Sequence, residues 1–500
     1  MKWTLVMVCF SVSESARILF VSKPLDKSHA SSAIPFLDRL AKTGHQVSFY
    51  CETYSYFKLP KGLVNRQVLL QKPATDPDLE REQDVKRTWI TESDSNRVYA
   101  LWLPTLRIYS EHKTLNPRSF ERLFNESWDF IFTDSVFTAS SIPVVYLQRK
   151  PSALFHNIFM FHYDNYFRGL TQPPGNMPPF YMSHERAVWY PENFWDRLYD
   201  HLQSAIILWN LSVRISRAIS GTVRDEVTAF SWNQWYQLNQ ISFSDYFDIL
   251  NFPAPISNQI VSIGAHCATS TVQPLPDSLK EYVNDPQSKG TILIAFGMSV
   301  RWSRAPKEKT EAILNGVKHL RDFRIVWSFD GDSSGFPPHI KTLDWIPQHD
   351  LLHHPKTTLF ISHGGLKSLR ETVCAGVPAV FVPMFAEQVR NSFLARKLGF
   401  GAYLNKKNLT AADVKGQVDR MLHDPMAKKN IIRAQAMWKD RLKDGFDLGL
   451  FWTEKMLKHN GLPVKHFVPQ STNRYLLQTV YADLFSVWIF LSTVILSVSL

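Results

Sequence analysis

The stretch that decides the fold runs from Trp345 to Asn391 and reads WIPQHDLLHHPKTTLFISHGGLKSLRETVCAGVPAVFVPMFAEQVRN. Two apolar runs within it, TLFIS (358–362) and AVFVPM (379–384), are short and uncharged, which predicts two buried strands. A glycine pair between them leads into a helix that we expect to start at about Leu366. A buried strand, a glycine turn, a helix and a second strand predict one unit of a parallel sheet covered by helices.

The same alternation of strands and helices extends outward through the chain. In the front half, a first strand is followed by a helical pattern over 32–43, which Gly44 ends. Two such sets predict an α/β fold of two Rossmann-like domains, whose parallel sheets face each other across a cleft that binds the ligand. The remaining strand-like runs are RILFVS (17–22), QVSFYC (46–51), WDFIFTD (128–134), TILIAF (291–296) and RIVWSF (324–329).

Composition bounds the class of protein. The 500 residues are 45% hydrophobic and 20% charged, which describes a folded chain of several domains. The net charge of +11 is scattered, and its densest cluster, around Lys428, Lys429 and Arg433, indicates a solvated helix face rather than a nucleic-acid site. Cys51, Cys267 and Cys374 have no metal-ligand spacing, and we expect three buried thiols without a disulfide framework.

The two ends of the chain predict a membrane protein. Residues 1–16, with Lys2 before the apolar stretch Trp3–Val12, have the pattern of a signal peptide; the alternative is a buried first strand. The uncharged run 484–500 predicts a transmembrane helix at the short limit of length, with a buried core helix as the alternative. Together they imply a single-pass type I protein with lumenal catalytic domains. Three glycosylation sequons agree with this, at Asn125, Asn210 and Asn408.

The stretch around the glycine pair resembles the signature of the UDP-glycosyltransferases, the family that includes the glucuronosyltransferases. Similarity extends to Gly44-His45-x-Val, to Gln273-Pro-Leu-Pro276 and to Phe451-Trp452. The resemblance implies a GT-B-like fold, an acceptor domain over 17–275 and a UDP-sugar domain over 276–460, joined by 461–483 to the anchor. It also implies the endoplasmic-reticulum membrane and contacts to the UDP-sugar from Trp345, Gln348, His363, Gly364, Gly365, Ser368, Glu371, Glu387 and Gln388.

The chemistry of these residues suits a nucleotide sugar. Trp345 can stack on uracil, and Gln348 offers both a donor and an acceptor. Gly364 and the helix after it can bring amides to a diphosphate. Glu371 can accept both hydroxyls of a ribose. The family pair that holds the hydroxyls of the transferred sugar falls on Glu387 and Gln388.

Four positions depart from the family pattern. Glu387 stands where the family usually carries Asp, which leaves glucose versus glucuronic acid open. Ala295 and Met298 replace two expected hydroxyls, so Gly297 and Ser299 become the possible diphosphate contacts. Lys367 brings a cation to the helix start. The alternative function is a catalytically impaired protein of the same fold that binds a UDP-sugar or a lipophile.

The resemblance places the catalytic pair in the front half. His29 falls at the position of the general base, for which imidazole suits neutral pH. Asp134 falls at the position of the carboxylate that orients it. We expect an inverting single displacement with no metal and no cofactor, and we interpret Asp330-Gly-Asp332 as a turn and not a metal motif.

The acceptor is the least defined partner. A membrane anchor favours a small lipophilic acceptor, and the aromatic stretches Phe155–Phe167 and Phe230–Tyr236 either line its pocket or form core, with core favoured. Gln203–Ile215 is too short to span a membrane and lies either in the bilayer interface or in the core. The remaining rival is a transferase that acts on glycans. A homo-oligomer is possible.

Overall fold

The computed structural model describes residues 15–70, 88–92, 97–158, 162–170, 177–254, 256–264, 267, 272–462 and 482–499. Residues 1–14 of the predicted signal peptide, the second Asp-x-Asp motif at Asp76 and Asp78, and residues 463–481 of the predicted connecting segment lie outside the described residues.

The first domain is built on a seven-stranded sheet in the order β3-β2-β1-β4-β5-β6-β7. All its pairings are parallel, and helices cover both faces, which is why its central strands carry uninterrupted apolar runs. The strands are β1 (Arg17–Val21), β2 (Gln46–Thr53), β3 (Leu63–Leu69), β4 (Phe130–Asp134), β5 (Ser152–His156), β6 (Asn239–Ser244) and β7 (Ile260–Ser262).

Helix α1 (Lys27–Ala41) starts five residues before the predicted segment 32–43. The reason is a cap: a side-chain oxygen of Asp26 accepts hydrogen bonds from the amides of Ser28 and His29. His29 therefore lies in the first turn of a helix, directly after β1. The other helices of this domain are α3 (Arg97–Leu115), α4 (Pro117–Asn125), α5 (Ser141–Gln148), α6 (His162–Phe167), α7 (Phe194–Trp209), α8 (Ser216–Thr222) and α9 (Trp232–Leu238), with a π-helical segment η1 (Asn210–Ile215) between α7 and α8.

The second domain repeats the plan with a six-stranded parallel sheet in the order β10-β9-β8-β11-β12-β13. Its strands are β8 (Thr291–Ala295), β9 (Arg324–Ser328), β10 (Ile340–Leu343), β11 (Thr357–Ser362), β12 (Ala379–Phe381) and β13 (Gly401–Tyr403). Its helices are α10 (Asp277–Val283), α11 (Lys307–Val317), α12 (Gln348–Leu352), α13 (Leu366–Ala375), α14 (Gln388–Lys397), α15 (Ala411–His423) and α16 (Pro425–Lys439), with the short 3₁₀ turn η2 (Trp302–Arg304). The predicted strands and the two-sheet plan are thus confirmed.

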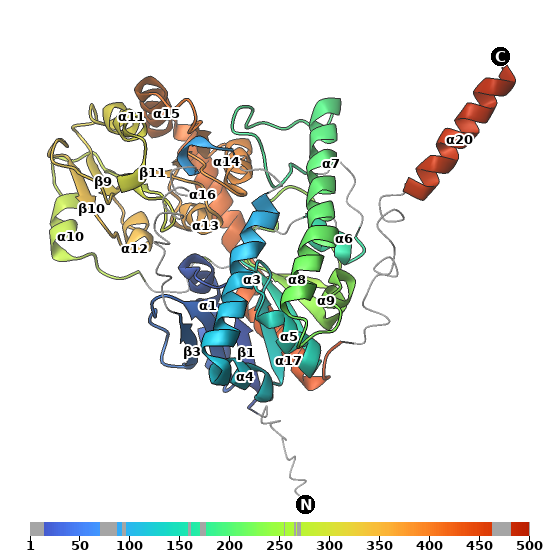
Figure 1. Ribbon diagram of the computed structural model, residues 1–500. Helices are drawn as coiled ribbons and strands as arrows, with labels where there is room; N and C mark the ends of the chain where they lie inside the picture. The colour runs from blue at the N-terminus through green and yellow to red at the C-terminus, as the bar shows by residue number, and fades with distance from the viewer. Residues whose placement is uncertain are drawn as a thin grey trace, which may run out of the picture.

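The chain then returns to the first domain through α17 (Gly445–Lys458). In Figure 1 this helix lies beside the blue and teal elements of the first domain, away from the yellow sheet of the second. Phe446 packs on Phe36 of α1 with ring centroids 5.6 Å apart, and His45 bonds Glu454 at 2.6 Å. The sequence interpretation grouped these residues with the second domain, 276–460, whereas α17 packs in the core of the first.

One apolar cluster continues from the first domain into the second. Phe247, which follows β6, packs on Trp438 of α16 with ring centroids 4.6 Å apart. The two aromatic stretches belong largely to core, as favoured from the sequence. Phe167, Trp232 and Tyr236 are buried in this cluster, and Phe155 is buried in a separate cluster of the first domain.

Two expectations from the sequence are wrong, one about the cysteines and one about a glycosylation sequon. Cys267 and Cys374 form a disulfide that joins the segment after β7 to the last turn of α13, and only Cys51 remains a buried free thiol among the described cysteines. The partners stand 107 residues apart, and spacing along the chain carries no signal for such a contact. The sequon at Asn210 is not on the surface, because Asn210 is buried in η1 and bonds Arg214 at 3.1 Å.

The C-terminal apolar run forms helix α20 (Ala482–Ser499), apart from both domains in Figure 1. Among the residues that the structure describes, no helix combines the length and the apolar character needed to cross a membrane. The predicted transmembrane helix stays a prediction. The segment Gln203–Ile215 is divided, with Leu211 and Ile215 in the core and Ile206 and Trp209 exposed.

Candidate active site

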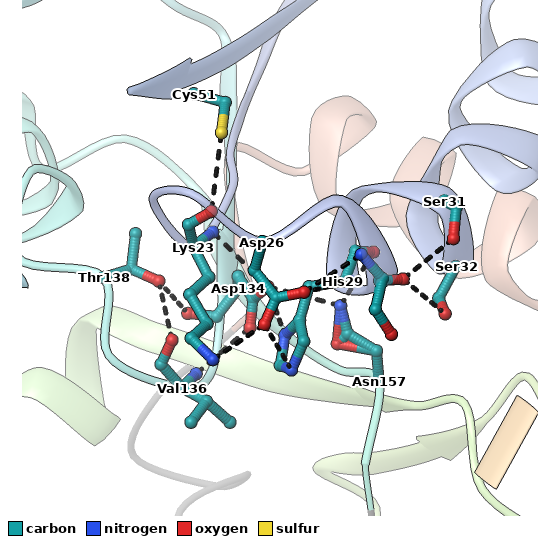
Figure 2. Close-up of polar contacts among 11 residues, drawn as sticks. Lys23, Asp26, His29, Ser31, Ser32, Cys51, Asp134, Val136, Thr138 and Asn157 are labelled. Atoms are coloured by element: carbon teal, nitrogen blue, oxygen red, sulfur yellow. Dashed lines mark hydrogen bonds and ion pairs between the residues drawn. The ribbon is translucent and has the colours of Figure 1, made fainter. Parts of the chain in front are cut away.

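His29 and Asp134 meet at the carboxyl edge of the first sheet. β1 and β4 pair in parallel, so the residues that follow β1 lie beside the end of β4, where Asp134 stands. The Nδ1 atom of His29 is 2.8 Å from Oδ2 of Asp134, and both side chains are buried. Figure 2 shows the imidazole in contact with both Asp134 and Asp26. A carboxylate only accepts hydrogen bonds, so Nδ1 carries the hydrogen and Nε2 is left as the basic atom of the neutral ring.

The Asp134 carboxylate is fixed by several donors. Besides His29, its Oδ2 accepts from Nδ2 of Asn157 at 3.2 Å and from the Lys23 amide at 3.4 Å. Its Oδ1 accepts from the Val136 amide at 3.2 Å. These hydrogen bonds hold the carboxylate in one orientation. The position of the imidazole is therefore set before any substrate binds.

A second carboxylate, Asp26, stands on the far side of the imidazole. Its Oδ2 lies 3.8 Å from Nε2 of His29 and 2.8 Å from Nζ of Lys23. Burial acts to raise the pKa of Asp26, but the charges of Lys23 and His29 outweigh it and hold that pKa well below its ordinary value. Burial acts to lower the pKa of His29, and the charges of Asp134 and Asp26 outweigh it, so that the pKa is raised. Sequence analysis missed Asp26, although its cap position before α1 was a readable signal.

The turn after β11 builds a tight cradle around His363. Gly364 has φ +81°, in the left-handed region that favours glycine. A Cβ on Gly365 would lie 2.7 Å from Nε2 of His363, and a Cβ on Gly297 would lie 3.0 Å from Cε1 of the same ring. Both glycines thus leave room for the imidazole, and α13 begins at the next residue, Leu366. Backbone amides at this helix start suit an anion.

His363 is neutral in this cradle. Burial lowers its pKa to about 4, and its Nδ1 atom has no hydrogen-bond partner among the described residues. A neutral imidazole has one N–H to donate, so His363 has a hydrogen-bonding atom to spare for a ligand.

Two of the residues predicted to bind the UDP-sugar, Ser368 and Glu371, lie in α13 and contact a third, Gln348. Gln348, the first residue of α12, donates from Nε2 to a carboxylate oxygen of Glu371 and lies 3.4 Å from Oγ of Ser368. Trp345 stands 73% exposed before α12, so the indole face is open for stacking. An exposed aromatic next to a hydrogen-bonded amide and carboxylate is an arrangement that can hold a nucleoside.

Glu387 and Gln388 stand at the start of α14 and are buried. Oε1 of Gln388 accepts from the amides of Met384 at 2.8 Å and Phe385 at 3.1 Å, which fixes the side chain. Burial raises the pKa of Glu387, against the opposing charge of His29 and hydrogen bonds from the backbone.

A direct contact joins the two domains near these residues. Nζ of Lys367 on α13 lies 3.1 Å from Oγ of Ser31, two residues after His29 on α1.

Two predicted features lie apart from these clusters. Ser299 lies on an exposed turn over 297–299 and makes no hydrogen bond to the described residues, while Ala295 is buried in β8 beside Ser362. Asp330 accepts from the amides of Trp302 and Ser303 and so holds the start of η2, and the chain bends at Gly331. Among the described residues, His, Cys, Asp and Glu form no cluster of three that could hold a metal. The expectation of a metal-free site stays a prediction.

Two Rossmann-like domains with parallel sheets, joined so that their carboxyl-edge residues meet, define the GT-B class of glycosyltransferase fold. Solved structures of that fold match nearly the whole chain. The Medicago truncatula UGT71G1 structure complexed with UDP-glucose aligns with a TM-score of 0.59 at 16% identity, over 90% of this chain and 99% of that one. CalG4, the calicheamicin glycosyltransferase, aligns with a TM-score of 0.57 at 15% identity, over 89% of this chain and 99% of that one.

The sequence comparison narrows the class to a family. The family model described as UDP-glucoronosyl and UDP-glucosyl transferase matches residues 17–499, so the chain belongs to the UDP-glycosyltransferase family and is a transferase. Similar curated proteins include human UDP-glucuronosyltransferase 1A10, 26% identical over 92% of this chain and 86% of that protein. Human UDP-glucuronosyltransferase 2B7 is 23% identical over 92% of this chain and 89% of that protein.

Proposed function

We propose that this chain transfers a hexose or hexuronic acid from a UDP-sugar to a hydroxyl of a small lipophilic acceptor, with inversion at the anomeric carbon. The observation that carries the proposal is the His29–Asp134 pair, bonded at 2.8 Å on a domain whose helix α1 contacts the donor helix α13 through Ser31 and Lys367. A general base held next to the domain that binds the donor is what a single displacement requires.

The reaction proceeds in one step. Nε2 of His29 takes the proton of the acceptor hydroxyl as the acceptor oxygen bonds to C1 of the sugar, and the bond from C1 to the UDP oxygen breaks. Asp134 stabilises the resulting imidazolium through Nδ1. The charge that develops on UDP is met by His363, the amides of Gly364 and Gly365 and the start of α13. No metal or cofactor takes part.

The donor is held by residues of the second domain. Trp345 stacks on the uracil, and Gln348 meets its polar groups. Glu371 accepts the ribose hydroxyls, and Ser368 lies beside it. The transferred sugar lies against Glu387 and Gln388, whose Nε2 is left for a sugar hydroxyl because its Oε1 is already bonded. We assign Gly297 to the diphosphate because it packs on His363, and Ser299 follows it on the same exposed turn.

A mostly apolar hollow lies in the first domain between α6 and α7. Its free volume of about 10 Å³ has room for no more than a water molecule, so an acceptor would have to open it. The lining residues are Tyr163, Pro179, Phe180, Tyr181, Gln203, Ser204 and Ile207.

The proposal includes a single-pass type I location in the endoplasmic-reticulum membrane, with residues 1–16 as signal peptide and 484–500 as anchor. Helix α7 supports contact with a bilayer, because one face exposes an apolar stripe at helical spacing, Trp195, Tyr199, Leu202, Ile206 and Trp209. Tryptophans at both ends of such a stripe suit a membrane interface. Release of the full chain from microsomes by alkaline carbonate would contradict the anchor.

The experiment measures UDP release from UDP-glucuronate and UDP-glucose with a panel of phenols and steroids. We expect one donor to be preferred, activity to survive EDTA, and His29→Ala to lose about 10²–10⁴-fold in kcat. Tight UDP binding without release would favour the catalytically impaired alternative. Release only with glycan acceptors would favour the glycan transferase.

A further inference from the structure

A buried asparagine completes the catalytic edge of the first sheet. Asn157 is the first residue after β5, the strand that pairs in parallel with β4. The carboxyl ends of β1, β4 and β5 therefore place His29, Asp134 and Asn157 in one row. Only 5% of Asn157 is exposed.

The amide of Asn157 bonds both members of the catalytic pair. Its Nδ2 donates to Oδ2 of Asp134 at 3.2 Å and to the backbone carbonyl of His29, also at 3.2 Å. Figure 2 shows Asn157 beside both residues. The orientation of the amide is fixed by chemistry, because a flipped amide would set its carbonyl oxygen against two acceptors.

The other end of this side chain argues against a role in packing alone. Oδ1 of Asn157 is buried without a hydrogen-bond partner among the described residues. An unbonded buried carbonyl costs stability, and a hydrophobic side chain would fill the same space without that cost. Costs of this kind are expected where function requires the residue.

We propose that Asn157 is a positioning residue of the transferase reaction, which locks the His29 turn of α1 to the Asp134 carboxylate and shares Oδ2 of that carboxylate with the imidazole. The proposal rests on the proposed function. Asn157 does not reach the reacting atoms and acts through His29 and Asp134. With its donation to Oδ2, part of the negative charge of Asp134 is engaged by the amide, which limits how strongly the carboxylate favours the imidazolium.

The charged surroundings of His29 set the direction of the effect. Asp134 faces it from β4, Asp26 and Lys23 face it from the segment before α1, and Glu387 faces it from the start of α14. Cys51 on β2 lies near the same carboxylates, and burial raises the pKa of its thiol well above the ordinary value, so it is neutral. Replacement of the donating amide by an acceptor adds to the carboxylates around His29 and strengthens its hold on a proton.

The test compares the wild type with Asn157→Asp and Asn157→Leu. We expect kcat to fall about tenfold or more in both, with the KM for the UDP-sugar changed less than about twofold. We also expect the acid limb of the pH profile to move to higher pH in Asn157→Asp. The matched control is Asn239→Asp, because Asn239 is equally buried with an unbonded Oδ1 but stands at the amino end of β6, away from the site.

A second readout is independent of activity. We expect the NMR titration of His29, assigned by its loss in His29→Ala, to move to higher pH in Asn157→Asp and to stay in place in Asn239→Asp. An unchanged titration and an unchanged kcat in Asn157→Asp, with a loss of thermal stability like that of the control, would overturn the proposal. If the wild type released no UDP with any donor, the proposed function would fail, while the titration would still decide the role of Asn157.

Discussion

At the residue scale, the chemistry depends on how one imidazole is held. His29 bonds Asp134 through Nδ1, and a second carboxylate, Asp26, lies 3.8 Å from Nε2. Both carboxylates act to raise the pKa of His29, and together they outweigh the effect of burial. The raised pKa makes His29 a stronger base. The acceptor hydroxyl has to lie next to Nε2 of His29, the nitrogen that Asp26 also faces.

This arrangement predicts the pH dependence of the reaction. The reactive form of His29 is neutral, and its pKa in the folded protein is raised above the ordinary 6.5. Activity is therefore expected at high pH and should fall as the pH drops through a value above 6.5. Profiles of kcat/KM against pH measure this limb.

The substitution Asp26→Asn should move that limb to lower pH. It removes one of the two carboxylates that favour the imidazolium, while asparagine still caps α1. Thermal unfolding serves as the control, since a preserved cap predicts little change in stability. A limb that stayed at the wild-type pH would show that Asp26 has no influence on His29.

Substitutions of the two carboxylates assigned to the UDP-sugar, Glu371 and Glu387, should have different kinetic effects. Glu371→Ala should weaken inhibition by UDP about tenfold or more, because Glu371 is assigned to the ribose. Glu387→Ala should raise the KM of the UDP-sugar by a similar factor and leave inhibition by UDP nearly unchanged, because Glu387 is assigned to the sugar. Equal effects of both variants on UDP inhibition would refute the assignment.

At the element scale, α13 carries most of the donor cradle and is tied to the first domain twice. The guanidinium of Arg370 forms two hydrogen bonds with the carboxylate of Asp245, at 2.7 and 2.8 Å, and the pair is buried. One turn later, Cys374 forms the disulfide with Cys267. Both partners follow strands of the first sheet, β6 and β7, so the helix that holds the nucleotide has a fixed place relative to His29.

Breaking the ion pair tests this tie. Arg370→Met leaves the Asp245 carboxylate buried without its guanidinium, which should lower the free energy of unfolding by about 3–5 kcal/mol. Urea unfolding measures the change. Arg433→Met is the matched control, because Arg433 is exposed on α16 and should change stability by less than about 0.5 kcal/mol.

Glycosylation offers a second test at this scale. Asn125, at the end of α4, and Asn408, between β13 and α15, are exposed, whereas Asn210 is buried in η1. In a secreted-pathway host, mass spectrometry of the peptides should find glycans at Asn125 and Asn408 and none at Asn210. A glycan at Asn210 would mean that this side chain is exposed at some stage, either before the chain folds or when η1 unfolds locally.

The elements themselves were largely predictable, because strands buried on both faces leave uninterrupted apolar runs such as TLFIS (358–362). His29 and Asp134 were identified by their places after strands and by family resemblance. Asn157 and the pair Arg370–Asp245 were not identified, because their contacts join residues far apart in the chain and leave no periodic signal. Asp26 was missed although an aspartate before a helix is a readable cap signal. The disulfide was not predicted either, because its two cysteines also lie far apart in the chain.

At the scale of the whole molecule, the architecture sets a base in one domain against a nucleotide cradle in the other. α17 returns from the second domain to pack on α1, the helix that carries His29, and Lys367 reaches from α13 to Ser31 on the same helix. Both contacts fix the distance between base and donor, which single-displacement chemistry requires to within a fraction of an ångström.

The central claim is tested most directly by a crystal structure of the His29→Ala variant with an intact UDP-sugar. The account predicts uracil on Trp345, ribose on Glu371, diphosphate at His363 and Gly364, and the sugar between Glu387 and the site of the missing imidazole, with C1 open to that side. A nucleotide bound elsewhere, or a sugar whose C1 faces away from residue 29, would contradict it.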